Sequence, residues 1–194
     1  PVGDLHCGNP AFSEKHLDYE LGIISADPFG YMVLMGDLCD TVLKDSKGNI
    51  YRQIMSPSEQ KKYIIKKLTQ LKSKIIGSTV GNHEERISRS TDQDISAEMA
   101  EALGCPYRFE GLWLRLYVGG GSGGHQNRQY TYHIYATHGF GSAVTTGARA
   151  NKIERISQNV SADVYIMAHD HQAMNFSGVR VDPNEKVCQR GIYT

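Results

Sequence analysis

Five short polar clusters hold the side chains of this 194-residue sequence that are best suited to metal and acid–base chemistry. Each cluster follows a short apolar run, and together they contain five of the eight histidines. Imidazole, carboxylate and amide groups without a thiolate suit manganese, iron, zinc or a similar ion, whereas a structural zinc knot uses cysteine. The set therefore predicts a metal site. In chain order, the clusters are Asp4 with His6, Asp37 with Asp40, Asn82 with His83, His138, and His169 with His171.

The position of Asp37 follows from the residues before it. Residues 31–35 form an apolar run that is too short for a helix and predicts a buried strand. Gly36 lets the backbone turn sharply, which delivers Asp37 to the carboxyl edge of that strand. Ligands of open α/β sheets bind outside the carboxyl ends of the strands, so we expect Asp37 to lie at the centre of a site.

Two of the clusters space their residues two apart. On an extended segment, residues i and i+2 point to the same side. Asp4 with His6, and His169 with His171, are therefore each expected to present two ligand atoms to one place. Taken singly, every cluster has an ordinary structural explanation, such as a hydrogen-bonded histidine or a turn aspartate. Five clusters in one order favour the metal site.

The motifs in this order resemble those of the calcineurin-like metallophosphoesterase superfamily, and in length the chain is similar to its compact bacterial and phage members. The family pattern is D-x-H, G-D-x-x-D, G-N-H-[DE], a lone H and G-H-x-H. The match spans residues 4–171 and is specific as a set; Ala168 stands where the family usually has glycine, and its small side chain should keep the ligands in place. The matching segments are Asp4–His6, Gly36–Asp40, Gly81–Glu84, His138 and Ala168–His171.

The resemblance implies a four-layer α/β/β/α sandwich that holds two divalent metal ions bridged by Asp37. His83 would be the general acid, and Asp40 the carboxylate that orients it. Manganese is the expected metal, with zinc, iron, nickel or magnesium as alternatives. The implied ligands are Asp4, His6, Asp37 and His171 for one ion, and Asp37, Asn82, His138 and His169 for the other.

These residue types fit the implied reaction, which is hydrolysis of a phosphoester. Two cations about 3.5–4 Å apart clamp the attacking and leaving oxygens of an in-line phosphoryl displacement. They also lower the pKa of a bridging water, so that no side-chain base is needed. His83 is next to the ligands and is suited to protonating the leaving group. Arg86, just after the third motif, is a candidate for contacting a substrate phosphate.

Several substrate classes stay open at this stage. Protein phosphatases of the family carry arginines beside two motifs where this chain has Thr41 and Val80. Repair exonucleases share the metal motifs, and the lysine-rich segment 56–74 would be their DNA track, although a solvated helix face is its simpler interpretation. We favour a nucleic-acid or nucleotide phosphodiester. The alternatives are a phosphomonoesterase or a non-catalytic scaffold member.

The surrounding pattern predicts one domain over residues 1–194 in which strands and helices alternate. The first strand, before Asp4, is expected to be short or incomplete. Residues 119–124 are glycine-rich and predict a hairpin tip, and Trp113 is expected in the core. Helices are predicted over residues 13–25, 56–71, 94–103 and 144–160, and strands over 31–35, 74–80, 112–118, 129–137 and 163–167.

Composition points to a soluble, cytoplasmic protein with no membrane partner. Lysine plus arginine equals aspartate plus glutamate at 21 each, so the net charge is zero. No apolar run approaches the roughly 20 residues of a membrane span, and the first residues lack the features of a signal peptide. The four cysteines, which form no C-x-x-C pair, are expected to be free thiols. The oligomeric state is left open.

Overall fold

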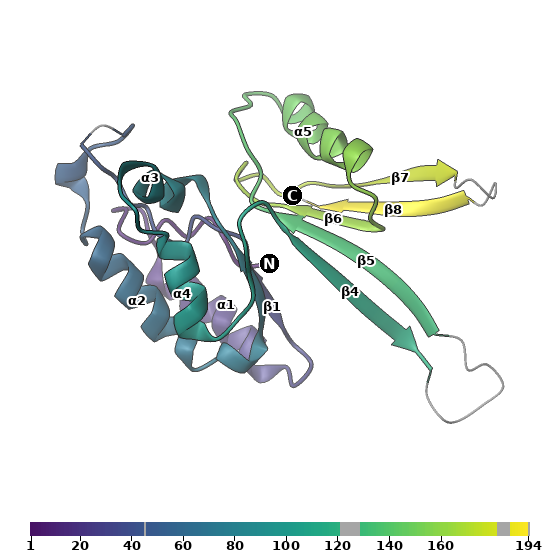
Figure 1. The fold of residues 1–194 in the computed structure, drawn as a ribbon, viewed down its shortest axis with the longest axis horizontal. Coiled ribbons are helices and arrows are strands. Elements are labelled where there is room, and N and C mark those ends of the chain that lie inside the picture. Colours follow the sequence, from purple (N-terminus) through teal and green to yellow (C-terminus); the bar gives the residue numbers. More distant parts are fainter. Residues whose placement is uncertain (45, 121–128, 182–186, 194) are drawn as a thin grey trace. The chain divides into compact units, whose positions relative to one another are not determined.

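The computed structural model describes the chain except residues 45, 121–128, 182–186 and 194 (Figure 1). The chain forms two compact units, Pro1–Glu110 (unit 1) and Gly111–Thr194 (unit 2), and each is described by itself. Both units combine helices with a β-sheet, which confirms the predicted α/β class. Within the described residues, no helix is long and apolar enough to cross a membrane.

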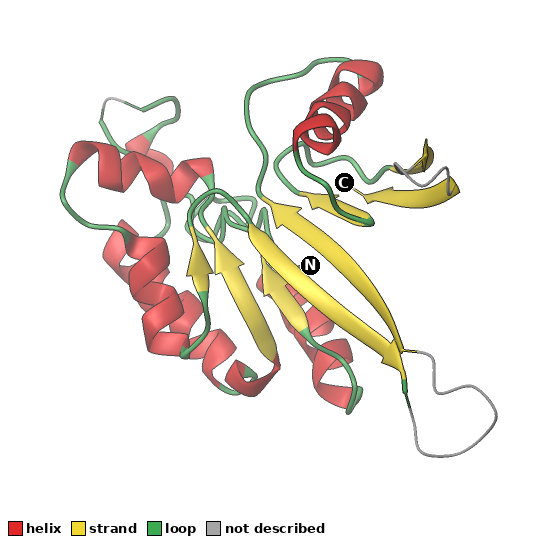
Figure 2. Cartoon of the chain, turned by 45° about the vertical axis from the view of Figure 1, so that its right-hand side comes forward, coloured by secondary structure: helices red, strands yellow, loops and turns green. Residues whose placement is uncertain are grey.

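Unit 1 is built on a three-stranded parallel sheet whose order is β1-β2-β3. The arrowheads of these strands point the same way in Figure 2. Before Asp4, Val2 pairs with Leu34 as an isolated parallel bridge. The elements of unit 1 are β1 (Met32–Leu34), β2 (Ile75–Thr79), β3 (Tyr107–Arg108), α1 (Glu14–Ala26), α2 (Pro57–Thr69), α3 (Asn82–Ser90), α4 (Ile95–Leu103), and the short 3₁₀ helices η1 (Ile50–Arg52) and η2 (Lys72–Lys74).

The helix ends of unit 1 follow from local sequence. Ser13 caps α1 and accepts a hydrogen bond from the backbone of His16. Ser56 and Glu59 form a complete capping box on α2, with a proline at the first helical position. Gly104 ends α4 in the left-handed conformation, with φ of 68°. These three predicted helices are confirmed, whereas α3 was not predicted as a helix.

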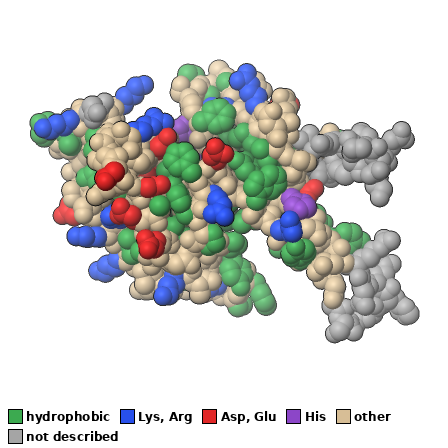
Figure 3. Space-filling view, in the orientation of Figure 1, with side chains coloured by type: hydrophobic (Ala, Val, Ile, Leu, Met, Phe, Trp, Pro, Cys, Tyr) green, Lys and Arg blue, Asp and Glu red, His purple; other side chains and the backbone are tan. Residues whose placement is uncertain are grey.

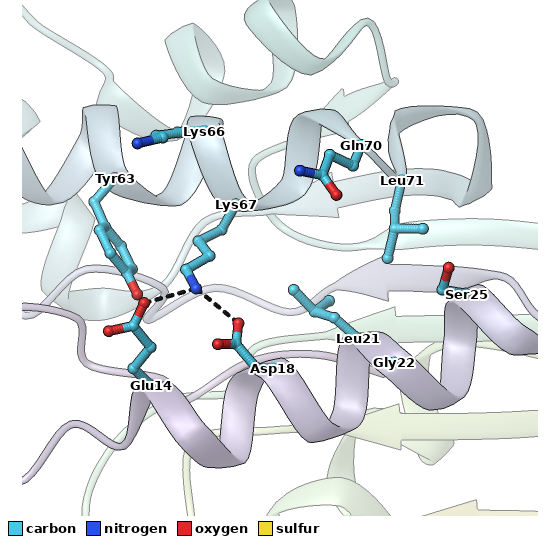
Figure 4. A pocket seen from close by; sticks show the side chains of 10 residues that line it. All are labelled: Glu14, Asp18, Leu21, Gly22, Ser25, Tyr63, Lys66, Lys67, Gln70 and Leu71. Carbon is cyan, nitrogen blue, oxygen red and sulfur yellow. Dashed lines mark hydrogen bonds and ion pairs between the residues drawn. The ribbon is translucent and has the colours of Figure 1, made fainter.

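Helices α1 and α2 contribute apolar side chains to one core, and ion pairs also join the two helices. Leu21 of α1 and Leu68 of α2 are both buried in the core of unit 1. In Figure 4, Lys67 of α2 points toward α1, where its Nζ lies 2.6 Å from Glu14 Oε1 and 2.7 Å from Asp18 Oδ1. Exposed ion pairs are worth about 0–1 kcal/mol, so apolar burial is the main stabilising contribution here.

The capping box of α2 gives a first testable prediction. Replacing Ser56 with alanine leaves the Glu59 backbone N–H without its side-chain acceptor and should lower the free energy of unfolding by about 1 kcal/mol. The matched control is Ser58→Ala, an exposed serine one residue inside the same helix. Urea unfolding of both variants measures the difference, and equal midpoints would contradict the capping role.

Unit 2 is a five-stranded mixed sheet whose order is β4-β5-β6-β8-β7. The central pairs β5·β6 and β6·β8 are parallel, and the two outer pairs are antiparallel (Figure 1). Helix α5 buries Ile153 against Tyr165 and Met167. The elements are β4 (Leu112–Gly119), β5 (Gln129–Thr137), α5 (Thr146–Asn159), β6 (Val164–Met167), β7 (Asn175–Val181) and β8 (Val187–Tyr193).

The predicted strands and helix of unit 2 are confirmed, but other expectations for it are not. The core position predicted for Trp113 is wrong, because the side chain is 52% exposed. Strands β7 and β8 were not predicted. The predicted hairpin tip lies mostly outside the described residues. Of the cysteines, Cys7, Cys39 and Cys105 are free thiols as expected, and the side chain of Cys188 is outside the described part.

Candidate metal centre

The carboxyl ends of β1 and β2 meet at a contact between two glycine-containing loops. A Cβ atom on Gly36 would lie 2.4 Å from the backbone nitrogen of Gly81. A Cβ on Gly81 would lie 2.0 Å from the backbone nitrogen of Asp37. Because real Cβ atoms do not approach so closely, both positions require glycine. The two loops therefore pack backbone to backbone, which places Asp37 beside the first turn of α3.

Asp37 is buried and held by α3. Its Oδ1 accepts a hydrogen bond of 2.8 Å from the backbone N–H of His83, at the helix N-terminus, where the helix dipole favours a negative charge. In return, Glu84 accepts the backbone N–H of Asp37 at 2.9 Å and that of Cys39 at 2.8 Å. This pairing fixes the loop that carries the predicted bridging ligand.

Glu84 is a positioning residue that the sequence reasoning missed. Its side chain is only 1% exposed, although it follows two polar residues on α3. Glu84 is the last residue of the third motif, and the resemblance implied no role for it. The motif itself could have indicated this role, because the carboxylate of an acidic residue at that position can accept hydrogen bonds from neighbouring backbone N–H groups.

Asp40 joins His6 and His83. Its Oδ1 lies 3.4 Å from His6 Nδ1 and 3.1 Å from His83 Nδ1. Its Oδ2 accepts hydrogen bonds from Asn9 at 3.2 Å and Gln53 at 2.6 Å. Burial alone would raise the pKa of Asp40, but the hydrogen bonds from His6, His83 and Gln53 outweigh burial and hold that pKa far below its usual value. The carboxylate is therefore ionised and fixes the orientation of both rings.

The environment of His83 matches a proton donor held by a carboxylate. Burial lowers the pKa of His83, but the hydrogen bond to Asp40 and the charge of Asp37 outweigh it, so the pKa is raised. Nδ1 lies 2.8 Å from the backbone carbonyl of Asp40, and Nε2 lies 3.8 Å from Asp37 Oδ2. The ring thus turns its Nδ1 toward Asp40 and its Nε2 toward the predicted metal ligand.

Unit 1 contains donors that could hold a metal ion. His6, Asp37 and His83 each offer one ligand atom within 4.8 Å of the others. Asp4 offers a carboxylate oxygen within 4.8 Å of a nitrogen of His6. Asn82 is the first residue of α3, directly before His83. The structure therefore brings the predicted residues of the first three clusters to one end of the unit 1 sheet, with a donor set that fits a hard or borderline divalent cation.

Five of the seven predicted ligands share an unusual backbone conformation. Among the described residues, φ is positive at six non-glycine positions, and five of these are predicted ligands. This conformation costs a non-glycine residue about 1–2 kcal/mol, and such strain concentrates at functional sites. The six are Asp4, His6, Asp37, Thr41, His169 and His171, with φ between 44° and 75°. The expectation of extended backbone at D-x-H and H-x-H is therefore wrong.

Unit 2 has its own pair of metal-ligand candidates. His138 Nε2 lies 3.2 Å from His169 Nδ1, and the two rings are nearly perpendicular at 77°. Two imidazole nitrogens that bind one ion at about 2.0–2.1 Å lie at a similar separation. The other nitrogen of His169 bonds the backbone carbonyl of Gly141. Ligand histidines commonly make such a bond, which fixes the tautomer. The geometry of this pair fits metal ligation.

The loop that carries His169 and His171 is tied to α5 by a buried ion pair. Lys152 Nζ lies 2.5 Å from Asp170 Oδ1, and the two side chains are 10% and 5% exposed. Lys152 also bonds the backbone carbonyl of Gly141, the same oxygen that accepts from His169. Sequence reasoning missed Lys152, because a lysine in a predicted helix gives no signal that it is buried.

The chain was compared with known proteins. No model of a known protein family and no curated protein matches it. The function proposed for this chain therefore rests on its own residues and their geometry.

Proposed function

We propose that this chain is a dimetal phosphodiesterase of the calcineurin-like metallophosphoesterase type. The observation that carries the proposal is the arrangement of Asp37 and Asp40 with the two rings of His6 and His83, because it combines a buried carboxylate ligand with an oriented proton donor. The strained backbone at the ligand positions supports it. A four-layer sandwich is part of this proposal.

The proposed ligand sets are those that the family resemblance implies. The ions, when bound, supply an electrophilic clamp on the phosphate and a hydroxide at neutral pH. Asp37 offers two carboxylate oxygens and is suited to bridging, while the amide of Asn82 adds an oxygen without further negative charge. The ligands would be Asp4, His6, Asp37 and His171 for one ion, and Asp37, Asn82, His138 and His169 for the other.

The side chains of unit 1 account for the proton transfer in hydrolysis. One water is consumed, a new P–O bond forms and the P–O bond to the leaving alcohol breaks. His83 gives its Nε2 proton to the leaving oxygen, and Asp40 holds the ring through Nδ1 and stabilises its protonated form. The attacking water releases one proton in the same cycle, and this replaces the proton that His83 has lost. The products are a phosphomonoester and an alcohol.

Metal add-back to stripped protein tests the proposal. We expect bis-p-nitrophenyl phosphate to be hydrolysed when manganese is supplied, with little hydrolysis of p-nitrophenyl phosphate. A preference for the monoester would indicate a phosphomonoesterase and contradict the proposed diesterase. Absence of turnover with manganese, zinc, iron, nickel and magnesium would contradict the enzyme and favour a scaffold.

The role of His83 gives a second prediction. His83→Gln should lower kcat by about 10²–10⁴-fold for a dinucleotide, whose leaving alcohol needs a proton. The loss should be much smaller for bis-p-nitrophenyl phosphate, since p-nitrophenolate leaves without one. Manganese content, measured by mass spectrometry, should be unchanged. Equal losses on both substrates would contradict the assignment of a general acid.

A further inference from the structure

A pocket of unit 1 opens beside His83. Its volume is about 440 Å³, and its walls include His83, Asp40, Lys47, Arg52 and Gln53. Asp40 is the acidic residue among the described lining residues, and its two oxygens already face the side chains of four neighbours. Within the described part of the chain, no ion pair engages Lys47 or Arg52. The pocket therefore offers two positive charges next to the proposed proton donor.

A second pocket of unit 1 shares the lining residue Lys47 with the first. Its volume is about 430 Å³, and its walls include Lys47, Arg86, Arg89 and Ser90. Arg86 Nη1 is buried and has no hydrogen-bond partner among the described residues. An unsatisfied buried donor is costly, and a guanidinium is well suited to a phosphate. Arg86 thus brings a positive charge to the wall of the second pocket, and one of its N–H donors is left without a partner among the described residues.

One face of α3 connects the two pockets. His83, Arg86 and Ser90 follow one another at spacings of three and four residues, which places them on the same side of the helix. Lys47 lines both pockets. In Figure 3, blue Lys and Arg side chains lie at the upper left, over the region of α3 and the loop before α2. The cationic surface therefore leads away from the site.

Tyr51 is an exposed aromatic residue next in sequence to Arg52, which lines the first pocket. It lies in η1 between two lining residues, Asn49 and Arg52, and its side chain is 92% exposed. Asn49 accepts the backbone N–H of Tyr51 at 2.9 Å, which fixes the local turn. An exposed aromatic ring beside cations is the arrangement on which single-stranded nucleic acids stack their bases. An exposed aromatic ring would not contribute to binding a small inorganic anion.

The lysines of α2 form a weaker binding surface for phosphates than their number suggests. Lys67 pairs with Glu14 and Asp18, and Lys61 pairs with Glu98. Part of the positive charge on that helix is therefore neutralised within unit 1, in contrast to Lys47, Arg52 and Arg86.

We propose that the two pockets bind single-stranded nucleic acid on the leaving-group side of the bond that is cleaved. Lys47, Arg52 and Arg86 contact phosphates that flank the reacting one, and a base stacks on Tyr51. The inference rests on the proposed function, and it deepens that function by naming a polynucleotide as the substrate class.

Binding of a labelled oligonucleotide tests the surface separately from turnover. The probe is a fluorescein-labelled, single-stranded phosphorothioate decamer, which keeps its charges and resists cleavage. It is added to the manganese-loaded chain of residues 1–194. We expect Lys47→Gln with Arg86→Gln to weaken binding by at least about tenfold. The slope of log Kd against log salt should also fall, by about 0.7 for each phosphate that the protein no longer neutralises. Tyr51→Ala should weaken binding by about tenfold.

The matched control removes the same charge from α2. Lys62 and Lys66 are exposed on that helix, and Lys62→Gln with Lys66→Gln should change the affinity by less than about twofold. Unchanged melting temperatures exclude misfolding as the cause. An equal or larger loss in the α2 double variant would overturn the inference.

The binding and turnover measurements test the nucleic-acid surface and the proposed function separately. Turnover without any effect of the Lys47 and Arg86 changes on oligonucleotide binding would overturn the inference alone. Binding that depends on these residues in a protein without turnover would overturn the proposed function and keep the nucleic-acid surface.

Discussion

Asp37→Asn is expected to lower kcat/KM for bis-p-nitrophenyl phosphate by at least about 10³-fold, which corresponds to about 4 kcal/mol of transition-state stabilisation. The exchange removes the negative charge of the proposed bridging ligand. It keeps an Oδ1 acceptor for the backbone N–H of His83, so the contact with α3 should survive. Steady-state kinetics with manganese, metal analysis and circular dichroism measure turnover, occupancy and folding separately.

The matched control for Asp37 is Asp18→Asn. Asp18 is half exposed on α1, where it pairs with Lys67, and its loss should leave kcat/KM within about twofold of the unmodified protein. If Asp37→Asn keeps more than a tenth of the activity while folded, Asp37 does not bridge two catalytic ions.

Glu84→Gln is expected to lower the free energy of unfolding by about 2–4 kcal/mol. The two carboxylate oxygens of Glu84 accept the backbone N–H groups of Asp37 and Cys39. Glutamine replaces one oxygen by an NH₂ group, which leaves a buried N–H facing another donor. An unsatisfied buried donor costs about 1–3 kcal/mol, and the loss of a charge-assisted hydrogen bond adds to it. Urea unfolding measures the change.

The next residue on the same helix supplies the control. Glu85 makes an exposed pair with Arg89 at 2.8 Å, so Glu85→Gln removes the same charge at a cost of at most about 0.5 kcal/mol. Similar unfolding midpoints for the two variants would show that Glu84 does not hold the Asp37 loop. Catalytic activity should fall only in Glu84→Gln, because only there does Asp37 lose its support.

Local rules account for the elements that were predicted from the sequence. The capping box at Ser56 and the left-handed glycine at 104 are set by neighbouring residues, and the structure has both. The run 31–35 was identified as a strand because it is short, apolar and followed by Gly36. The first three polar clusters of the candidate site lie together because each follows a parallel strand or bridge, and parallel strands end at the same edge of the sheet.

The unpredicted features depend on contacts between segments distant in the sequence. Helix α3 lacks an apolar stripe, and its start is fixed by the Asp37 carboxylate, which comes from another loop. The left-handed conformation at His6 and Asp37 was not predicted, because Asp and His adopt it more often than most residues but not often enough to mark a position. The burial of Lys152, like the start of α3, depends on a residue from another segment, Asp170.

The central claim is that two metal ions together make this chain a diesterase. Its most direct test is a titration of metal-stripped protein with manganese, in which bound ions are counted by mass spectrometry while hydrolysis of bis-p-nitrophenyl phosphate is followed. We predict two bound ions per chain, with turnover that requires the second. Full turnover at one ion per chain, or turnover that survives stripping, would contradict the account.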